Sequence, residues 1–266
     1  MTVDVAENLM PSQPAPRARR RFPKDVASDR IFYPLFIAGI WGGIAAGFGP
    51  ELVQHVRGGE APYPLIVHLH AAAFTGWVLL LMTQSLLIRT GRWQIHRRLG
   101  TAAIGLAAIM LFLGPAVALA IQRQQLGLAH PSPIFGNPAF LAVQFGGMID
   151  FAILLAAGLL LRANASAHRR LMLLATLAIT DAGFARATAP WIHQTLAPGF
   201  WTDFAGLYGA NFAMILLLGV YDLITRQRLH PAWVAGASYL FASEFVAELL
   251  QNNAAWKAFA THLVTG

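Results

Sequence analysis

Residues 64–100 read PLIVHLHAAAFTGWVLLLMTQSLLIRTGRWQIHRRLG, and this stretch decides the class of fold. Residues 64–88 contain no Asp, Glu, Lys or Arg, and a helix needs about 20 apolar residues to cross a bilayer. Arginines follow at once, at positions 89, 92, 97 and 98. Loops rich in Lys and Arg lie on the cytosolic side of a membrane. The stretch therefore predicts a transmembrane helix that ends at a cytosolic corner.

The composition extends this prediction to the whole chain. Of 266 residues, 56% are hydrophobic and only 12% are charged, whereas soluble domains carry roughly 25% charged residues. The net charge of +7 does not indicate a nucleic-acid partner, because the basic residues stand between apolar runs and not on one soluble face. The chain has no cysteine, which excludes disulfides, thiolate metal sites and cysteine nucleophiles.

The predicted fold is all-α, a bundle of seven transmembrane helices. The predicted spans are 31–49, 64–88, 101–122, 138–161, 171–192, 204–224 and 232–250. Before them, residues 1–29 are polar and basic, which predicts a disordered cytosolic tail lying on anionic lipid. Residues 30–251 form the seven-helix domain. Residues 252–266 are predicted to be a short external segment, with a helix at the membrane interface.

The distribution of arginine predicts the orientation. The connections after the second, fourth and sixth spans are rich in arginine, whereas the opposite loops hold only Arg57 and Arg123. The positive-inside rule then places the N-terminus in the cytosol and the C-terminus outside. The predicted location is the bacterial cytoplasmic (inner) membrane, with lipids and their anionic headgroups as partners.

The cytosolic corners repeat a short motif. His96-Arg-Arg-Leu99 recurs as His168-Arg-Arg-Leu171, and a shortened form ends at His230-Pro231. Such a repeat predicts three parallel helical hairpins preceded by one N-terminal helix. Two interpretations of the corners stay open, headgroup binding and a ligand or proton-relay role for His96 with His168. The arginines predicted to bind headgroups are Arg97, Arg98, Arg169 and Arg170.

Several polar side chains fall within the predicted spans, where lipid would penalise a charged group by about 2.5–3.5 kcal/mol. Such groups must face the bundle interior. We therefore expect a polar cavity open to the outside, with Arg186 paired to Glu244 or, second, to Asp150. The residues expected around this cavity are Asp150, Asp181, Arg186, Glu244, Asn211 and Gln144. The alternative is a set of interhelical hydrogen bonds and one buried ion pair that only stabilise the bundle.

Histidines form a second group of candidates, as ligands of a haem or a metal. His68 and His70 are two residues apart, so about 200° of helix rotation separates them and only one is expected to face inward. A b-type haem needs two facing imidazoles. His70 with His193, or His96 with His168, could supply them.

The run from His68-Leu-His70 through Gln84 to His96-Arg-Arg-Leu-Gly100 resembles a group of uncharacterised bacterial multi-pass membrane proteins. In that group a helix-borne histidine precedes an H-R-x-x-G corner, and the domain has no assigned function. The resemblance implies the membrane fold and no particular activity. The chain is more distantly similar to haem-carrying membrane bundles and to small proteins of respiratory-oxidase assembly.

Three functions stay open from the sequence. They are a transport, proton-linked or ligand-sensing role for the polar cavity, electron transfer by a b-type haem, and membrane assembly or scaffolding without a site. A retinal protein is excluded, because Lys257 lies beyond the last predicted span. The motifs H-E-x-x-H and G-x-S-x-G are absent from the sequence, which leaves enzymatic activity undecided.

Overall fold

The computed structural model describes residues 22, 25–59, 63–130, 132 and 134–266, and these residues form α-helices and one 3₁₀ turn but no strand. Most of the predicted N-terminal tail lies outside the described residues, but Asp29 is the first residue of the first helix. The elements are α1 (Asp29–Gly58), α2 (Leu65–Arg89), α3 (Trp93–Leu126), η1 (Pro138–Phe140), α4 (Leu141–Leu160), α5 (Ala165–Leu177), α6 (Asp181–Thr195), α7 (Phe200–Arg226), α8 (Pro231–Gln251) and α9 (Ala254–Thr265).

Several helices are long and apolar enough to cross a membrane. Five segments meet this criterion singly, namely α1, α2, α3, η1 with α4, and α7. The pair α5 and α6 meets it only together, which brings the number to six. The helix α8 coincides with the seventh predicted span, but it carries Glu244 and Glu248 and is not among the segments that meet the criterion. A helical protein with several candidate spans is thus confirmed, while the count of seven and the orientation stay predictions.

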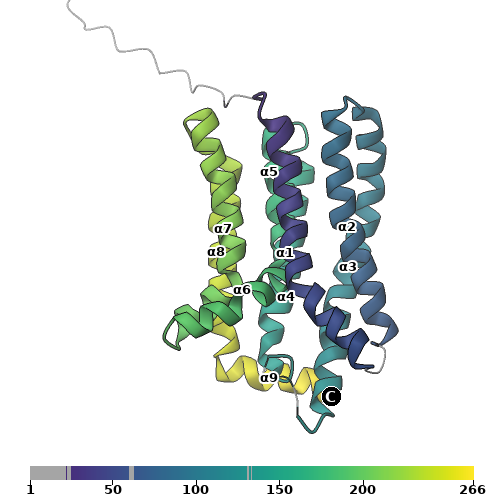
Figure 1. Cartoon of the computed structure of the whole chain (residues 1–266), viewed down its shortest axis with the longest axis vertical. Coiled ribbons are helices and arrows are strands. Elements are labelled where there is room, and N and C mark those ends of the chain that lie inside the picture. Colours follow the sequence, from purple (N-terminus) through teal and green to yellow (C-terminus); the bar gives the residue numbers. More distant parts are fainter. Residues whose placement is uncertain (1–21, 23–24, 60–62, 131, 133) are drawn as a thin grey trace, which may run out of the picture.

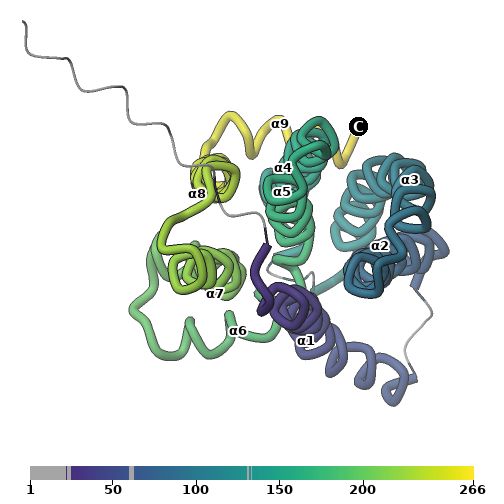
Figure 2. The backbone as a smooth tube through the Cα atoms, turned by 90° about the horizontal axis from the view of Figure 1, so that it is seen from above, coloured from purple at the N-terminus to yellow at the C-terminus, as the bar shows by residue number. Residues whose placement is uncertain are grey.

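The long helices stand side by side along one axis (Figure 1), and Figure 2 shows them from above. The corners α2–α3, α4–α5 and α7–α8, together with the start of α1, lie at one end, which we call the basic end. The helix α9 crosses the opposite end, which we call the α9 end. All three predicted arginine-rich corners therefore share one end of the bundle.

The outer surface of the bundle is apolar. Phe112 is 73% exposed, Leu160 79% and Ile224 70%, whereas Arg170 and Asp222 are completely buried. A soluble protein places its charged residues on the surface and its large apolar ones inside. The distribution here is inverted, as expected when lipid is the solvent around the helices.

The predicted hairpins pack unequally. The pairs α2 with α3 and α4 with α5 pack closely, but α7 packs mainly on α6, and α8 mainly on α4 and α5. A groove between α7 and α8 is lined mainly by apolar side chains, which include Ile215, Trp233 and Phe241. The Trp233 indole N–H of α8 donates to the Ile215 carbonyl of α7 at 2.9 Å. The helices α7 and α8 of the third predicted hairpin are therefore connected by their corner but make few contacts along their length.

The span predicted at 171–192 is not one helix, because the helix breaks at residues 178–180 and its two halves are bent by 57°. In an unbroken helix the Leu177 carbonyl would accept the Asp181 N–H. Instead it accepts the Thr180 backbone N–H at 2.9 Å, the Thr180 hydroxyl at 3.1 Å and the Asn211 amide at 3.0 Å. A side chain from α7 thus satisfies the carbonyl at the break, as irregular backbone inside a membrane requires.

Glycines bring α1 and α6 into close contact. A Cβ atom on Gly47 would lie 2.0 Å from the Gly183 carbonyl oxygen, and one on Gly183 would lie 3.0 Å from the Ile44 Cα. Neither position admits a side chain without a movement of the helices. The pair therefore holds the second half of the broken helix directly against α1.

The expected interfacial helix is confirmed as a helix, α9. Its residues Ala260 and Val264 are buried in a small cluster with Ala118 of α3. The Arg123 Nε donates to the Val264 carbonyl at 3.1 Å, which satisfies a carbonyl at the end of α9. The helix is thus fixed across the bundle.

Candidate functional site

Three carboxylic side chains from three helices lie together inside the bundle, and we call them the carboxyl triad. They are Asp150 of α4, Asp181 at the start of α6 and Glu244 of α8. Asp150 and Glu244 are buried, and so is the Asp181 Oδ1. Each of them interacts electrostatically with at least one of the others. Three of the residues expected around the cavity are thus brought together.

The hydrogen bonds of the triad are unequal. The Asp150 Oδ1 accepts from the Tyr239 hydroxyl at 2.7 Å and from the Ser243 hydroxyl at 2.6 Å. Within the described part of the chain, both carboxyl oxygens of Glu244 and the Asp181 Oδ1 are buried without a hydrogen-bond partner. A buried polar atom without a partner costs about 1–3 kcal/mol. An arrangement that leaves several in one place calls for a role other than stability.

Two neighbours on α7 complete this polar region. The Tyr208 hydroxyl and the Asn211 Oδ1 are also buried without a partner among the described residues. Tyr208 interacts electrostatically with all three carboxyls of the triad. Among the described residues, no basic side chain is one of the groups that act on the triad. The region therefore gathers carboxyl, phenol and amide groups, and no basic side chain among the described residues compensates them.

The predicted partners of Arg186 are wrong. Its Nε donates to Glu51 at 2.8 Å, and its guanidinium lies over the Phe48 ring, 4.5 Å from the ring centroid. The reason is that α1 continues to Gly58, beyond the predicted end at residue 49. Glu51 is therefore a helical neighbour of α6 and not a loop residue, and Arg186 does not need Glu244.

Gln144 stands apart from the triad. It precedes Asp150 by six residues, which is about 9 Å along α4 toward the α9 end. Its Oε1 is buried without a partner in the described residues. Two surface hollows, the α7–α8 groove and one lined by Thr83, Leu87 and Arg92, do not border the triad. The predicted cavity open to the outside stays a prediction.

The candidate histidines other than the corner pair are only partly available as ligands. His68 is exposed and His70 is half-buried against the Phe74 ring, so one of the two faces inward as expected. Both ring nitrogens of His193 are engaged, Nδ1 with the Ala189 carbonyl at 2.8 Å and Nε2 with Asp203 at 3.1 Å. His193 therefore has no nitrogen to offer a metal, and the pairing of His70 with His193 does not fit a haem.

The corner histidines do meet. The ring centroids of His96 and His168 are 6.5 Å apart and the rings are nearly perpendicular, at 88°. The His168 Nδ1 lies 2.8 Å from the Gly158 carbonyl, which can only accept, so Nδ1 carries a proton and Nε2 is left for another partner. In the part of the chain described, the His96 Nδ1 is buried without a hydrogen bond. Two imidazoles thus face each other at the basic end.

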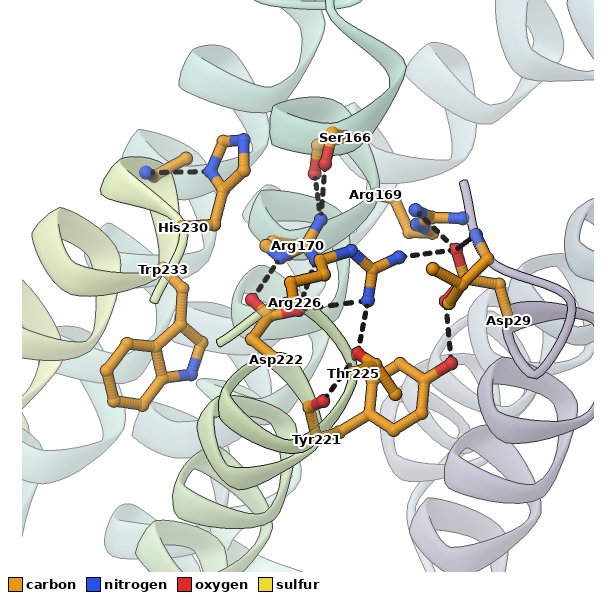
Figure 3. A network of polar contacts seen from close by, with 12 residues as sticks. Asp29, Ser166, Arg169, Arg170, Tyr221, Asp222, Thr225, Arg226, His230 and Trp233 are labelled. Atoms are coloured by element: carbon orange, nitrogen blue, oxygen red, sulfur yellow. Dashed lines mark hydrogen bonds and ion pairs between the residues drawn. The ribbon is translucent and has the colours of Figure 1, made fainter. Parts of the chain in front are cut away.

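A network of ion pairs ties three helices together at the basic end (Figure 3). The fully buried Arg170 of α5 donates from Nε to Asp222 of α7 at 2.7 Å and makes a second, short contact to the same carboxylate. Its remaining nitrogen donates to the Ser166 hydroxyl and carbonyl, both at 2.7 Å. Such a two-pronged pairing fixes geometry as well as charge. The prediction that Arg170 binds lipid headgroups is therefore wrong.

The same network reaches α1 through Asp29. Its carboxylate accepts from Arg226 at 2.6 Å, from Arg169 at 3.2 Å and from the Tyr221 hydroxyl at 2.7 Å. The guanidinium of Arg169 is thus engaged inside the protein, unlike the exposed Arg97 and Arg98.

Sequence reasoning missed this network. A usable signal was the pair Asp222 and Arg226, which stand four residues apart near the end of an apolar helix and therefore share one face.

His230 caps α8 beside this network. Its Nδ1 accepts the Ala232 backbone N–H at 3.0 Å, which is possible only while that nitrogen is unprotonated. Burial, aided by the positive charge of Arg170, lowers the pKa of His230 to about 4. The cap therefore holds at neutral pH.

In the described residues, no group of three or more His, Cys, Asp or Glu could hold a metal ion. No family model, no curated protein and no solved structure matches the chain. The resemblance drawn from the corner motifs therefore stays a prediction. The function is inferred below from the carboxyl triad and the histidine pair.

Proposed function

We propose that the chain is a proton-linked membrane transporter in which the carboxyl triad binds and releases protons. The observation that carries the proposal is the burial of Asp150, Asp181 and Glu244 together, without a basic partner in the described residues. Neighbouring carboxylates in a dry site cannot all be ionised, because each charge disfavours the next. The triad is therefore expected to hold exchangeable protons, as carboxylate relays in pumps and transporters do.

The broken helix supports the same function. Transporters often place the site for a substrate or coupling ion at helices interrupted near the middle of the membrane. Here Asp181 is the first residue after the break, and Asn211 reaches from α7 to the carbonyl at the break. A proton gained or lost by Asp181 therefore acts directly beside the break in the helix. Protonation can thus be coupled to a movement of α6 against α5.

A proton-flux measurement tests the proposal. The purified protein is reconstituted into liposomes that contain the pH dye pyranine, and a potassium gradient with valinomycin makes the interior negative. The wild-type protein is expected to acidify the interior faster than protein-free liposomes do. Asp181→Asn and Glu244→Gln are expected to abolish the difference. Glu51→Gln removes a carboxyl outside the triad and serves as the matched control, because Glu51 is half-exposed and paired with Arg186.

The result that contradicts the proposal is clear. Wild-type proteoliposomes would then take up protons no faster than empty ones, or the two triad variants would acidify at the wild-type rate. Protease access reports whether each variant inserts into the liposomes as the wild type does, and circular dichroism reports its helix content. These two checks separate loss of function from loss of fold.

A second candidate function, electron transfer by a b-type haem, is supported by the contact between His96 and His168. Axial ligation needs one unprotonated nitrogen from each ring. The Gly158 carbonyl leaves the Nε2 of His168 in that state, and the Nδ1 of His96 is buried without a partner among the described residues. The exposed Arg97 and Arg98 nearby are suited to haem propionates.

An absorption spectrum tests this second function. A Soret band in the purified protein that disappears in His168→Ala and persists in His68→Ala, at an exposed histidine, would support it. A spectrum without a Soret band after expression with added haem would eliminate it. The haem would supply one-electron redox chemistry, and the two histidines would hold its iron.

A further inference from the structure

We propose that protons reach the carboxyl triad from the α9 end through Tyr208 and Glu248, and that a layer of leucines closes the triad toward the basic end. This inference rests on the proposed function, since it assigns the access route of the same site. Glu248 is one of the polar residues that the sequence predicts near the cavity, whereas Tyr208 is a residue that sequence reasoning did not single out.

Glu248 is the next carboxyl along the route. It follows Glu244 by four residues, so both lie on one face of α8, with Glu248 about 6 Å nearer the α9 end. Its side chain is 1% exposed and accepts a short hydrogen bond from the Gln251 amide. A carboxyl group at this depth, one turn from a proton-binding site and one turn from the end of the helix, is well placed to pass protons between them.

The next group on the route is Tyr208, which belongs to the neighbouring helix and makes no hydrogen bond to either glutamate among the described residues. It lies on α7, is 2% exposed, and interacts electrostatically with both Glu244 and Glu248. Its hydroxyl has no hydrogen-bond partner in the described part of the structure. A phenol can donate and accept at once, which a relay between two carboxyls requires. The absence of a fixed partner leaves the hydroxyl free to serve either one.

The route ends at an exposed pair. Glu248 interacts electrostatically with Asp203, which accepts from the His193 Nε2 at 3.1 Å. The side chains of Asp203 and His193 are 56% and 45% exposed. Asp203 lies in the first turn of α7, at the α9 end. The route therefore reaches side chains exposed to solvent at the α9 end.

The opposite side of the triad is closed by apolar side chains, which we call the leucine layer. Leu174, Leu218 and Leu240, from α5, α7 and α8, are completely buried. Leu240 stands one turn from Glu244 toward the basic end. A Cβ atom on Gly236, one turn further, would lie 2.6 Å from Leu174, so α8 packs tightly against α5 at this level. Beyond the layer lies the ion-pair network of Arg170 and Asp222.

The proton step balances without another reactant. A proton leaves the Glu244 carboxyl for the Tyr208 hydroxyl oxygen while the phenolic proton passes to the Glu248 carboxylate. The proton on Glu248 then moves to the Asp203 carboxylate and from there to bulk water. The reverse order reloads Glu244 from the α9 end.

Hydrogen–deuterium exchange of the carboxyl groups, followed by infrared difference spectroscopy on the full-length protein in lipid, tests the route. The triad band is identified as the protonated carboxyl signal that disappears in Glu244→Gln. In Glu248→Gln and in Tyr208→Phe we expect this band to remain, and its exchange after a change to deuterated buffer to slow at least ten-fold. Glu248→Asp is expected to restore most of the rate, and Glu51→Gln is expected to leave it unchanged.

The outcomes separate this inference from the proposed function. A wild-type spectrum without any band that Glu244→Gln removes overturns both. A band that is present and exchanges at the wild-type rate in both Glu248→Gln and Tyr208→Phe overturns the route alone. If Glu248→Gln fails to fold, Tyr208→Phe decides, because it keeps the aromatic ring and removes only the hydroxyl.

Discussion

The ion pair between Arg170 and Asp222 offers the most quantitative test of the structure. Both side chains are completely buried at the basic end, and the pairing uses two nitrogens of one guanidinium. The perturbation is Asp222→Leu, which leaves the Arg170 charge buried with hydrogen bonds to Ser166 and the Phe22 ring nearby but, among the described residues, without a carboxylate partner. The companion variants are Arg170→Met and the double variant with both changes.

The expected magnitudes follow from what each variant leaves behind. Removing one partner of a buried pair costs about 3–5 kcal/mol, because the other charge stays uncompensated. Asp222→Leu should show this full cost. Arg170→Met should cost less, because Asp222 keeps Arg226 at 3.4 Å. The double variant should be the least destabilised of the three, because apolar replacement of a whole buried pair is often neutral.

Thermal unfolding of the purified protein in one detergent measures these differences. About 1 kcal/mol corresponds to roughly 2–4 °C in Tm for a chain of this size, so Asp222→Leu should lower the Tm by on the order of 10 °C. Size-exclusion profiles recorded after heating give an independent ranking of the stability of the three variants, and we expect the same ranking. The reasoning is refuted if Asp222→Leu melts within about 2 °C of the wild type, or if the double variant is as unstable as the two single changes added together.

Three further predictions follow from single sites. The free energy of unfolding should fall as the pH drops from 6.5, the ordinary pKa of histidine, toward about 4, because His230 binds a proton in the unfolded chain but not in the folded protein. His230→Asn keeps a capping acceptor and should flatten this part of a curve of Tm against pH. Glu244→Gln should keep or raise the Tm, since it replaces a carboxyl that can carry a buried charge by a neutral amide of the same shape, and a loss of several degrees would mark Glu244 as structural. Gly47→Leu should lower the free energy of unfolding by about 1–3 kcal/mol or more, because the side chain would force α1 away from Gly183. Gly42→Leu should leave the Tm unchanged, because nothing lies within 4 Å of a Cβ atom there, and equal Tm values for the two variants would disprove the close contact.

Much of the architecture could be predicted because hydropathy is a local property. Apolar runs and arginine corners are read from neighbouring residues alone, and they placed the spans close to the observed helices. The grouping of Asp150, Asp181, Glu244 and Asn211 also followed from a simple rule, since hydrocarbon offers such side chains no partner and they must turn inward. The structure brings these four together.

The rest depended on contacts between distant residues. The break after Leu177 is stabilised by the amide of Asn211, 34 residues further along the chain, and no local pattern encodes that contact. The partner of Arg186 was missed because α1 continues past its apolar part and carries Glu51 with it. Arg169 and Arg170 look like solvated loop charges in sequence, and only the positions of Asp29 and Asp222 on other helices turn them inward.

The bend between α5 and α6 also adjusts the chain to the thickness of a bilayer. As one straight helix, residues 165–195 would be about 46 Å long at 1.5 Å per residue, well beyond a hydrocarbon core of roughly 30 Å. With α5 along the membrane normal and α6 tilted by 57°, the two halves span only about 32 Å of depth. The kink thus shortens an overlong segment to about the thickness of the hydrocarbon core without deleting residues.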